Sequence, residues 1–163
     1  MTTFFKAMTQ FIIRKAMEED LPALLRFEQC VIAAERRFDP TLKTEPTRYY
    51  DIGQMITAAH IELLVAEQNK ELIGCGYARI ETSKPYLQHS QHAYLGFMYV
   101  EPEYRGKGIN RLIIEELRLW TLSQGIYEMR LEVYYENSPA IKAYEKTGFT
   151  RHMIEMRKGL KGE

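Results

Sequence analysis

The feature that most constrains the fold is a strand, a glycine-containing loop and a helix in direct succession, over residues 92–124. Residues 92–100 form an apolar and aromatic run without a polar face, which predicts a central strand covered on both sides. Pro102 breaks this strand. Apolar residues then recur at helical spacing over 108–124, and Gly125 ends the pattern. The succession predicts a mixed α/β fold.

The loop between this strand and this helix predicts an anion site. Gly106 and Gly108 remove side chains where backbone N–H groups must face a ligand, and the helix start adds partial positive charge. Arg105 and Lys107 add mobile charge. Neither of two familiar phosphate loops fits: no GxxxxGK[ST] run exists, and Arg111 stands where a dinucleotide fingerprint needs a small residue. The alternative is a turn that merely connects strand and helix.

Shorter patterns on either side predict the other elements. The predicted order is strand, helices, three strands, helix, strand, helix and strand, and the polar turn 68–70 indicates a hairpin. Asp20 stands at an N-cap position, Ser138 at another with Pro139 behind it, and residues 35–51 read as a loop region. The predicted strands cover 12–16, 61–67, 72–81, 127–134 and 149–157, and the predicted helices cover about 21–30, 48–59 and 139–147.

Length and composition predict a single domain, 1–163, with its core at about residues 11–158. The 22 basic residues match 22 acidic ones, so we expect neither a nucleic acid nor a membrane as partner. Cys30 and Cys75 form no CxxC pair, which argues against a metal site and a disulfide framework. Residues 1–16 contain only short apolar runs, so we expect no export signal and a cytoplasmic location.

A second motif lies downstream, where residues 137–149 read NSPAIKAYEKTGF. On a helix, Asn137, Ala140 and Tyr144 fall at i, i+3 and i+7 and share one face, which we expect to meet a cofactor. Taken singly, each has a structural alternative: a cap, a packing residue and a core aromatic, respectively.

Together the two motifs resemble those of the GNAT superfamily of acyl-CoA-dependent N-acyltransferases. The family signature [Q/R]-x-x-G-x-[G/A] is matched at Arg105 and Gly108, and N-x-x-A-x-x-x-Y-x-x-x-G-F is matched over 137–149. The sequence departs from the signature at Asn110, close to where the family holds the CoA pyrophosphate. The resemblance implies a twisted, mostly antiparallel central sheet of six to seven strands, splayed in the middle and flanked by about four helices.

The resemblance also implies acetyl-CoA as the acyl donor, and no metal. The backbone N–H of Met98 or a neighbour would bind the thioester oxygen, and the Asn137 side chain would hold the pantetheine arm. The cofactor-binding residues implied are Met98, Tyr99, Val100, Arg105, Gly106, Lys107, Gly108, Ile109, Asn110, Asn137, Ala140 and Tyr144.

Acetyl transfer to a primary amine needs a base for the ammonium and an acid for the departing thiolate. An alkylammonium has a pKa near ~10.4, so it must lose a proton before it attacks. Glu81 is the first candidate base, with Glu132 and Glu136 behind it, although solvated faces explain all three more simply. Tyr144 is the candidate acid, because a phenol stays protonated at neutral pH. The sequence therefore predicts an N-acetyltransferase that acts by direct attack in a ternary complex.

Other interpretations stay open. A non-catalytic acyl-CoA sensor or scaffold with the same fold would keep the loop without needing Tyr144 as an acid, and a nucleic-acid-binding domain would need a clustered basic surface. The acceptor could be a small molecule or a protein or peptide, and the regions 31–50 and 83–92 that would shape its site favour no single one. His89 and His92 could contact an acceptor, but we interpret His89 as a solvated loop residue and His92 as a strand-entry residue. Exposed strand edges make a homodimer plausible.

Overall fold

The structure is a computed structural model that describes residues 11–162. The chain divides into two units, the first ending at Glu132 and the second beginning at Val133. Unit 1 contains a sheet and the helices α1, α2 and α3, and unit 2 contains the helix α4 and the C-terminal segment.

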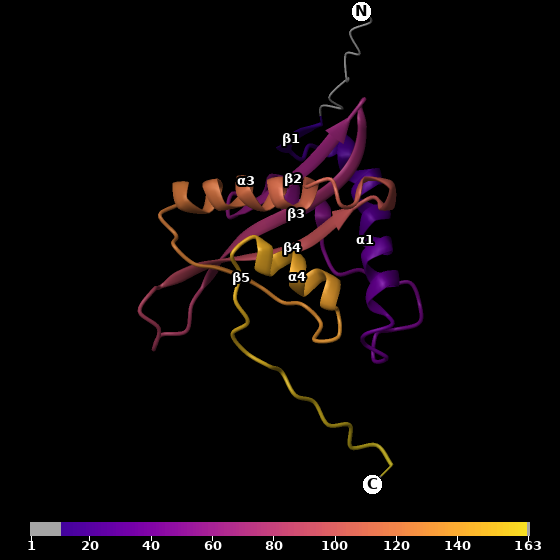
Figure 1. Ribbon diagram of the computed structural model, residues 1–163, viewed down its shortest axis with the longest axis vertical. Helices are drawn as coiled ribbons and strands as arrows, with labels where there is room; N and C mark the ends of the chain where they lie inside the picture. Colours follow the sequence, from indigo (N-terminus) through magenta and orange to yellow (C-terminus); the bar gives the residue numbers. More distant parts are fainter. Residues whose placement is uncertain (1–10, 163) are drawn as a thin grey trace, which may run out of the picture. The chain divides into compact units, whose positions relative to one another are not determined.

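The sheet of unit 1 has its strands in chain order, from β1 to β5. β1 to β4 pair antiparallel, whereas β5 pairs parallel to β4 after the crossover through α3 (Figure 1). The mixed, mostly antiparallel α/β fold expected from the sequence is confirmed. The strands are β1 (Ile12–Lys15), β2 (Ile61–Gln68), β3 (Glu71–Thr82), β4 (Gln91–Val100) and β5 (Met129–Leu131).

The hairpin between β2 and β3 is confirmed as a two-residue turn. Gln68 pairs with Glu71, and both Asn69 and Lys70 have positive φ, 51° and 66°. Two successive left-handed residues give the turn twist that matches antiparallel strands. The local sequence thus fixes how β2 and β3 align.

Helices cover both faces of the sheet. Phe27 of α1 packs on Tyr99 of β4 with ring centroids 4.7 Å apart, in a core that α2 also joins. On the other face, α3 lies across β2, β3 and β4 (Figure 1), and a Cβ at Gly76 would stand 2.9 Å from Ile113 of α3. The helices are α1 (Leu21–Glu35), α2 (Ile52–Thr57), α3 (Ile109–Ser123) and α4 (Ser138–Lys146), with 3₁₀ turns at Glu18–Asp20 and Pro102–Tyr104.

A buried carboxylate fixes the segment that joins α1 to α2. Glu28 of α1 has no exposed surface, and its Oε1 accepts the backbone N–H groups of Tyr49 (2.7 Å) and Tyr50 (2.9 Å). Two hydrogen bonds to one buried oxygen fix that oxygen relative to both amides. Glu28 therefore holds Tyr50 against the sheet, where its ring packs on Tyr77 and Phe97.

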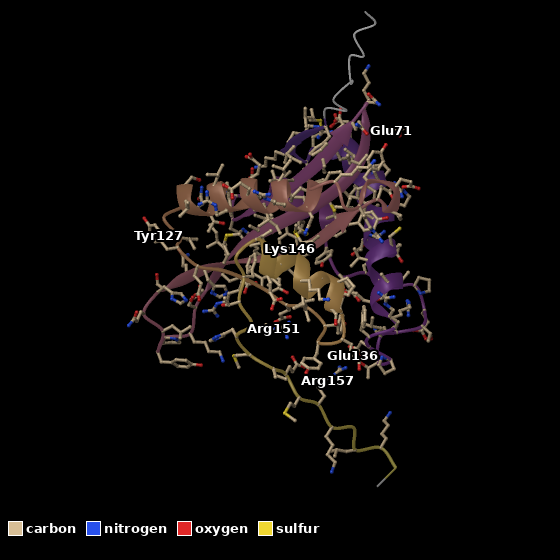
Figure 2. The ribbon with its side chains drawn as sticks, in the orientation of Figure 1. Glu71, Tyr127, Glu136, Lys146, Arg151 and Arg157 are labelled. Carbon is tan, nitrogen blue, oxygen red and sulfur yellow. The ribbon has the colours of Figure 1, made fainter. Side chains whose placement is uncertain are left out.

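The predicted strand count was wrong. The described residues contain five strands, and the strand expected over 127–134 is reduced to Met129–Leu131. Tyr127 projects into solvent with 85% of its surface exposed (Figure 2), so the alternation there marks no buried face. The last strand, expected over 149–157, has no strand assignment. Alternation and aromatic content favour a half-buried surface, but they do not supply a partner strand.

Two helix boundaries also differ from the predictions. α1 continues to Glu35, because Ile32 extends its buried stripe beyond residue 30. α2 begins only at Ile52, because the Asp51 side chain accepts the N–H of Gln54 (3.2 Å) and caps the helix there. Asp20 occupies the N-cap position of α1 as predicted, but its side chain makes no cap there and instead accepts from the guanidinium of Arg14 in β1.

Candidate active site

A β-bulge interrupts β4 opposite β3. Tyr77 pairs with Gly96 and Cys75 with Tyr99, so two β4 residues, Phe97 and Met98, face the single residue between Cys75 and Tyr77. Phe97 has a φ of 52°, which is uncommon for an aromatic residue, and the Cys75 thiol donates to its carbonyl (3.3 Å). A bulge bends the strand and redirects its backbone groups. The expected site residues Met98, Tyr99 and Val100 follow directly on this bend.

The loop after β4 offers a row of free backbone donors. In the part of the chain that the structure describes, none of the amides of residues 106–111 donates to a protein acceptor. Gly106 and Gly108 have φ of 75° and 82°, and a Cβ at either would meet nothing within 4 Å. Successive unpaired N–H groups at the start of α3 form an anion-binding site, because the helix dipole adds positive charge.

The two basic side chains of the loop lie against the protein. Arg105 Nε donates to the Val100 carbonyl (2.9 Å), and Lys107 Nζ lies 5.0 Å from the centre of the Tyr104 ring. Anion binding at this loop therefore depends mainly on the backbone. The remaining two expected loop residues begin α3, where Ile109 is buried and Asn110 is half-buried.

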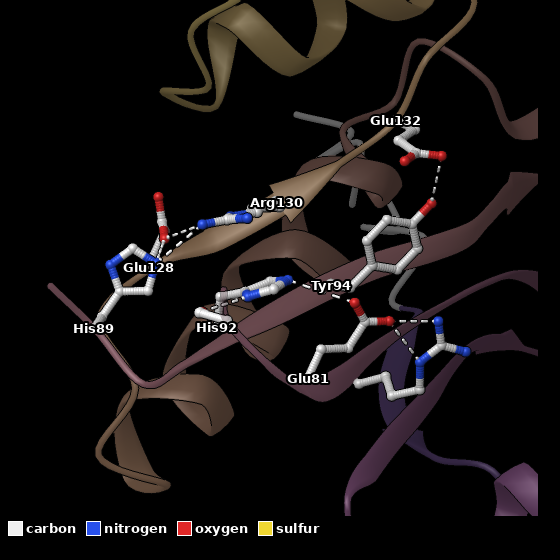
Figure 3. A network of polar contacts seen from close by, with 9 residues as sticks. Glu81, His89, His92, Tyr94, Glu128, Arg130 and Glu132 are labelled. Carbon is white, nitrogen blue, oxygen red and sulfur yellow. Dashed lines mark hydrogen bonds and ion pairs between the residues drawn. The ribbon is translucent and has the colours of Figure 1, made fainter. Parts of the chain in front are cut away.

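Glu81, the first candidate base, lies near the end of β3 in a polar network (Figure 3). Its Oε1 accepts from Arg79 Nε (3.0 Å) and Nη2 (2.6 Å), and its Oε2 lies 3.4 Å from His92 Nε2. The Ser83 hydroxyl lies 2.8 Å from His92 Nδ1. Because an ionised carboxylate can only accept, we assign the His92 proton to Nε2, so that Nδ1 accepts from Ser83.

His92 lies at the entry of β4, as the sequence predicts, and its side chain is buried in this network. Burial lowers the pKa of His92 below its ordinary value, and the nearby Arg130 guanidinium lowers it further. The imidazole is therefore neutral at physiological pH. His89 is not simply solvated, because it contacts Glu128 and lies 3.0 Å from Arg130 Nη2 (Figure 3).

Aromatic rings fill the sheet face between this network and the bulge. The rings of Tyr50 and Tyr77 are 5.7 Å apart, and those of Tyr77 and Tyr94 are 6.5 Å apart. Gly96 leaves room for the Tyr77 ring, because a Cβ there would stand 2.7 Å from the Tyr77 hydroxyl. Burial raises the pKa of Tyr50, Tyr77 and Tyr94 above the ordinary phenol value, so all three stay protonated at neutral pH.

In unit 2, the second motif forms the start and body of α4. Asn137, rather than Ser138, is the N-cap, and its Oδ1 accepts the N–H of Ala140 (3.4 Å). Tyr144 is half-buried, and its ring meets Phe149 edge-on at 6.1 Å. The capping alternative for Asn137 is thus realised, whereas Tyr144 is not a core aromatic, because α4 has no buried residue.

The comparisons with known proteins agree with this geometry. The sequence model described as "Acetyltransferase (GNAT) family" matches residues 27–149. The chain belongs to this family. The enzyme class and the fold expected from the two motifs are therefore confirmed.

Proteins similar to this GNAT protein include acetyltransferases that are named for different acceptors. A thialysine N-epsilon-acetyltransferase from Bos taurus is 30% identical over 152 residues, which cover 86% of this chain and 85% of the relative. Among solved structures, a mutant protein from Bacillus halodurans has a TM-score of 0.83 at 20% identity, covering 91% of this chain and 99% of that one. An aminoglycoside N-acetyltransferase in complex with CoA has a TM-score of 0.69 at 21% identity, covering 91% and 100%. At these identities the structures show a common fold.

Residues 11–162 contain neither a metal-type cluster nor a membrane-spanning helix. No cluster of three or more His, Cys, Asp or Glu side chains is arranged to hold a metal ion. No helix is both long and apolar enough to cross a membrane. The sequence interpretation missed Arg79, Tyr77 and Tyr94 as site residues; the register of β3 against β4 brings them together, and no local motif marks it.

Proposed function

We propose that this GNAT enzyme transfers the acetyl group of acetyl-CoA to a primary amine in a ternary complex. The observation that carries the proposal is the row of free amides over residues 106–111, after a bulged strand and at the start of a helix. A diphosphate is the ligand class that such a nest binds best. The resemblance of the loop to the family signature identifies that diphosphate as the one in coenzyme A.

The bulge supports a position for the thioester. By the family resemblance, the Met98 N–H takes the thioester oxygen, and Met98 and Val100 offer backbone groups to the pantetheine amides. A strand bent at Phe97 leaves room for an arm that hydrogen-bonds like an additional strand. The Asn137 side chain, by its motif position, would contact the same arm.

The reaction involves three proton transfers, of which the first and the last need an assigned base and acid. The ammonium of the acceptor first loses a proton, and its nitrogen lone pair then attacks the thioester carbon. The C–N bond forms, the C–S bond breaks, the amine nitrogen loses its second proton, and the thiolate takes up a proton to leave as CoA thiol. We propose Glu81 as the base and Tyr144 as the acid. Glu81 lies four residues beyond Tyr77 along β3, about 13 Å, so its proton transfer would run through water.

Direct attack is supported by the state of Cys75 beside the bulge. This thiol is fully buried, and burial raises its pKa well above the ordinary value. A thiol that stays protonated is a poor nucleophile, so an acyl-cysteine intermediate at Cys75 is disfavoured. Both cysteines are free, which supports a reducing, cytoplasmic setting.

The proposal is tested by incubating the purified enzyme with acetyl-CoA and a panel of amines, including thialysine, neamine, spermidine and a peptide. Mass spectrometry detects acetylated products, and a thiol reagent measures released CoA. We expect one or more acceptors to be acetylated with stoichiometric CoA release. Tight acetyl-CoA binding by calorimetry, without product from any amine or from a metabolite extract, would instead indicate the sensor or scaffold.

A further inference from the structure

Phe97 is the strained residue of the bulge in β4. Its φ of 52° lies in the left-handed region, which costs free energy for any residue with a side chain. Such a conformation persists only where neighbouring groups hold it. The next residue is Met98, whose backbone N–H is the proposed donor to the thioester oxygen. The contacts that hold Phe97 therefore decide where that donor lies.

Side chains from two other segments hold the backbone of Phe97. On β3, the Cys75 thiol donates to the Phe97 carbonyl (3.3 Å). Just before α2, Tyr50 places its ring 5.0 Å from the Phe97 ring, with 32° between the ring planes. The Tyr50 hydroxyl accepts a hydrogen bond from the backbone N–H of Phe97. Both polar backbone groups of Phe97 are thus bound by side chains, as expected for a residue that leaves the strand ladder.

Tyr50 is itself fixed by two neighbours. Its ring meets that of Tyr77 edge-on at 5.7 Å, and its backbone N–H donates to Glu28 Oε1 (2.9 Å). Glu28 Oε1 also accepts the N–H of Tyr49 (2.7 Å), whereas Glu28 Oε2 has no hydrogen-bond partner among residues 11–162. Burying a carboxyl group with one unpaired oxygen costs stability. Stability alone therefore does not account for Glu28 at this position, whereas a requirement for a fixed Tyr50 does.

We propose that Tyr50 is a positioning residue of the transferase and that Glu28 fixes Tyr50 for this role. Tyr50 holds Phe97 through its N–H, as Cys75 does through its carbonyl, and the bend so fixed places the Met98 N–H for the thioester oxygen. The inference rests on the proposed function, because the donor that Tyr50 positions belongs to that site. It adds the segment between α1 and α2 to the site, through contacts that no sequence motif marks.

Tyr50→Phe removes the hydroxyl and keeps both ring contacts. With the amine of the panel that is acetylated fastest, we expect kcat to fall about tenfold, because a displacement of about 1 Å costs up to about a hundredfold in rate. KM and the calorimetric Kd for acetyl-CoA should stay unchanged, since the amides of residues 106–111 are untouched. Burial raises the pKa of Tyr50, so its hydroxyl stays protonated, and the pH profile of kcat should keep its shape.

Hydrogen–deuterium exchange followed by mass spectrometry measures the bulge directly and needs no acceptor. In Tyr50→Phe, peptides that cover the bulge should exchange faster than in wild type, and peptides from α3 should not change. Tyr49→Phe is the matched control for this measurement. The Tyr49 amide is also bound by Glu28, its ring meets that of Tyr50 at 5.8 Å, and its hydroxyl contacts Glu35. Exchange over the bulge should therefore be unchanged in the control.

Two substitutions test the part played by Glu28. Glu28→Gln keeps an oxygen that can accept both amides, so it should retain most of kcat. Glu28→Met has a similar length but no such oxygen, so it should lower kcat as Tyr50→Phe does, with faster exchange over the bulge. If Glu28→Met does not fold, Tyr50→Phe decides, because it leaves both amide contacts of Glu28 intact.

Three outcomes for Tyr50→Phe would overturn the inference. Unchanged kcat with unchanged exchange would show that the hydroxyl holds nothing. A shifted pH profile of kcat would make Tyr50 a group that transfers protons and not a positioning residue. A weaker Kd for acetyl-CoA at unchanged kcat would make it a residue of donor binding. Faster exchange over the bulge, with no amine acetylated by the wild-type protein, would instead support the hold on Phe97 and refute the transferase.

Discussion

The candidate site residues of this GNAT enzyme differ in how many contacts fix their side chains and support their proposed roles. Arg79 is fixed by two rings and one carboxylate, so its direction is set before any ligand binds. Glu81 has one oxygen occupied by Arg79 and the other facing His92. Tyr144, in unit 2, takes its proposed role from its motif position. The proposed roles of Glu81 and Tyr144 therefore need separate experiments.

Tyr144→Phe should lower kcat about tenfold to a hundredfold, because the thiolate then leaves without its proton donor. Acetyl-CoA affinity should change little, since the ring that packs on Phe149 is kept. Stopped-flow measurement of CoA release and calorimetry with acetyl-CoA separate the two effects. Normal turnover in the variant would remove Tyr144 from the mechanism.

Glu81→Gln should lower kcat/KM for every acceptor by about a hundredfold, because the amide cannot take a proton from the ammonium. The loss should shrink as the pH of the assay rises, since more of the amine is then already neutral. Glu115→Gln, on the exposed face of α3, is the control for loss of a carboxylate bound to arginine. A pH-independent loss would show that Glu81 only orients Arg79.

At the level of elements, the loop between β4 and α3 combines two left-handed glycines with a helix start. The left-handed backbone at Gly106 and Gly108 costs little only without a side chain. The same conformation occurs at Gly125, at the other end of α3, where no helix N-terminus is near. The two ends of one helix therefore provide a test and its control.

Gly108→Glu should abolish measurable CoA binding, because a carboxylate in the nest repels the diphosphate. Gly125→Glu carries the same change at a φ of 71° and should keep CoA affinity, even if both variants lose about 1 kcal/mol of stability. Calorimetry with CoA and thermal melts of both variants give the comparison. Unchanged affinity in Gly108→Glu would refute the assignment of the loop.

The elements that could be predicted from the sequence are those specified locally. The turn at Asn69 and Lys70, the apolar run of β4 and the periodicity of α3 each lie within one short segment. The bulge could not be predicted, because Phe97 is not a residue type that marks positive φ. The Arg79 site depends on the register of two strands, and residues 149–157 show that alternation alone does not make a strand.

In the molecule as a whole, positive and negative charges balance, but several ion pairs lie close together at the start of unit 1. Arg14 of β1 donates to both oxygens of Asp20 (2.7 and 2.9 Å) and to Glu67 of β2 (2.8 Å). The Met17 N–H adds a further bond to Asp20 (2.9 Å). The cluster ties the first strand to its neighbour and to the start of α1. Whether the chain is one domain, and whether it forms a dimer, stay predictions.

This cluster should make the stability of the enzyme depend on pH. The Arg14 guanidinium holds the pKa of Asp20 below its ordinary value of 3.8, with only 8% of the side chain exposed. As the pH falls below that value, Asp20 in the unfolded chain takes up a proton before Asp20 in the folded chain does. The contribution of Asp20 to the free energy of unfolding is therefore complete above about pH 4 and is lost as the pH falls towards the lower pKa of the folded state. Asp20→Asn should cost about 2 kcal/mol at pH 7 and less in acid.

Urea unfolding of wild type and Asp20→Asn between pH 3 and pH 7 measures this dependence. The two proteins should converge as the solution becomes more acidic. A constant difference in the free energy of unfolding across that range would mean that the stabilisation from the Arg14 contact does not depend on the ionisation of Asp20.

The buried thiol of Cys75, beside the bulge, can report on local separation of β3 and β4. Cys75 has no exposed surface and its thiol donates a hydrogen bond to the carbonyl of Phe97, whereas Cys30 is partly exposed. A thiol reagent added to the native protein therefore modifies Cys30 directly and reaches Cys75 only when β3 and β4 separate locally. The rate of the slow labelling phase then measures how often β3 and β4 separate. Acetyl-CoA bound along the bulge should lower this rate.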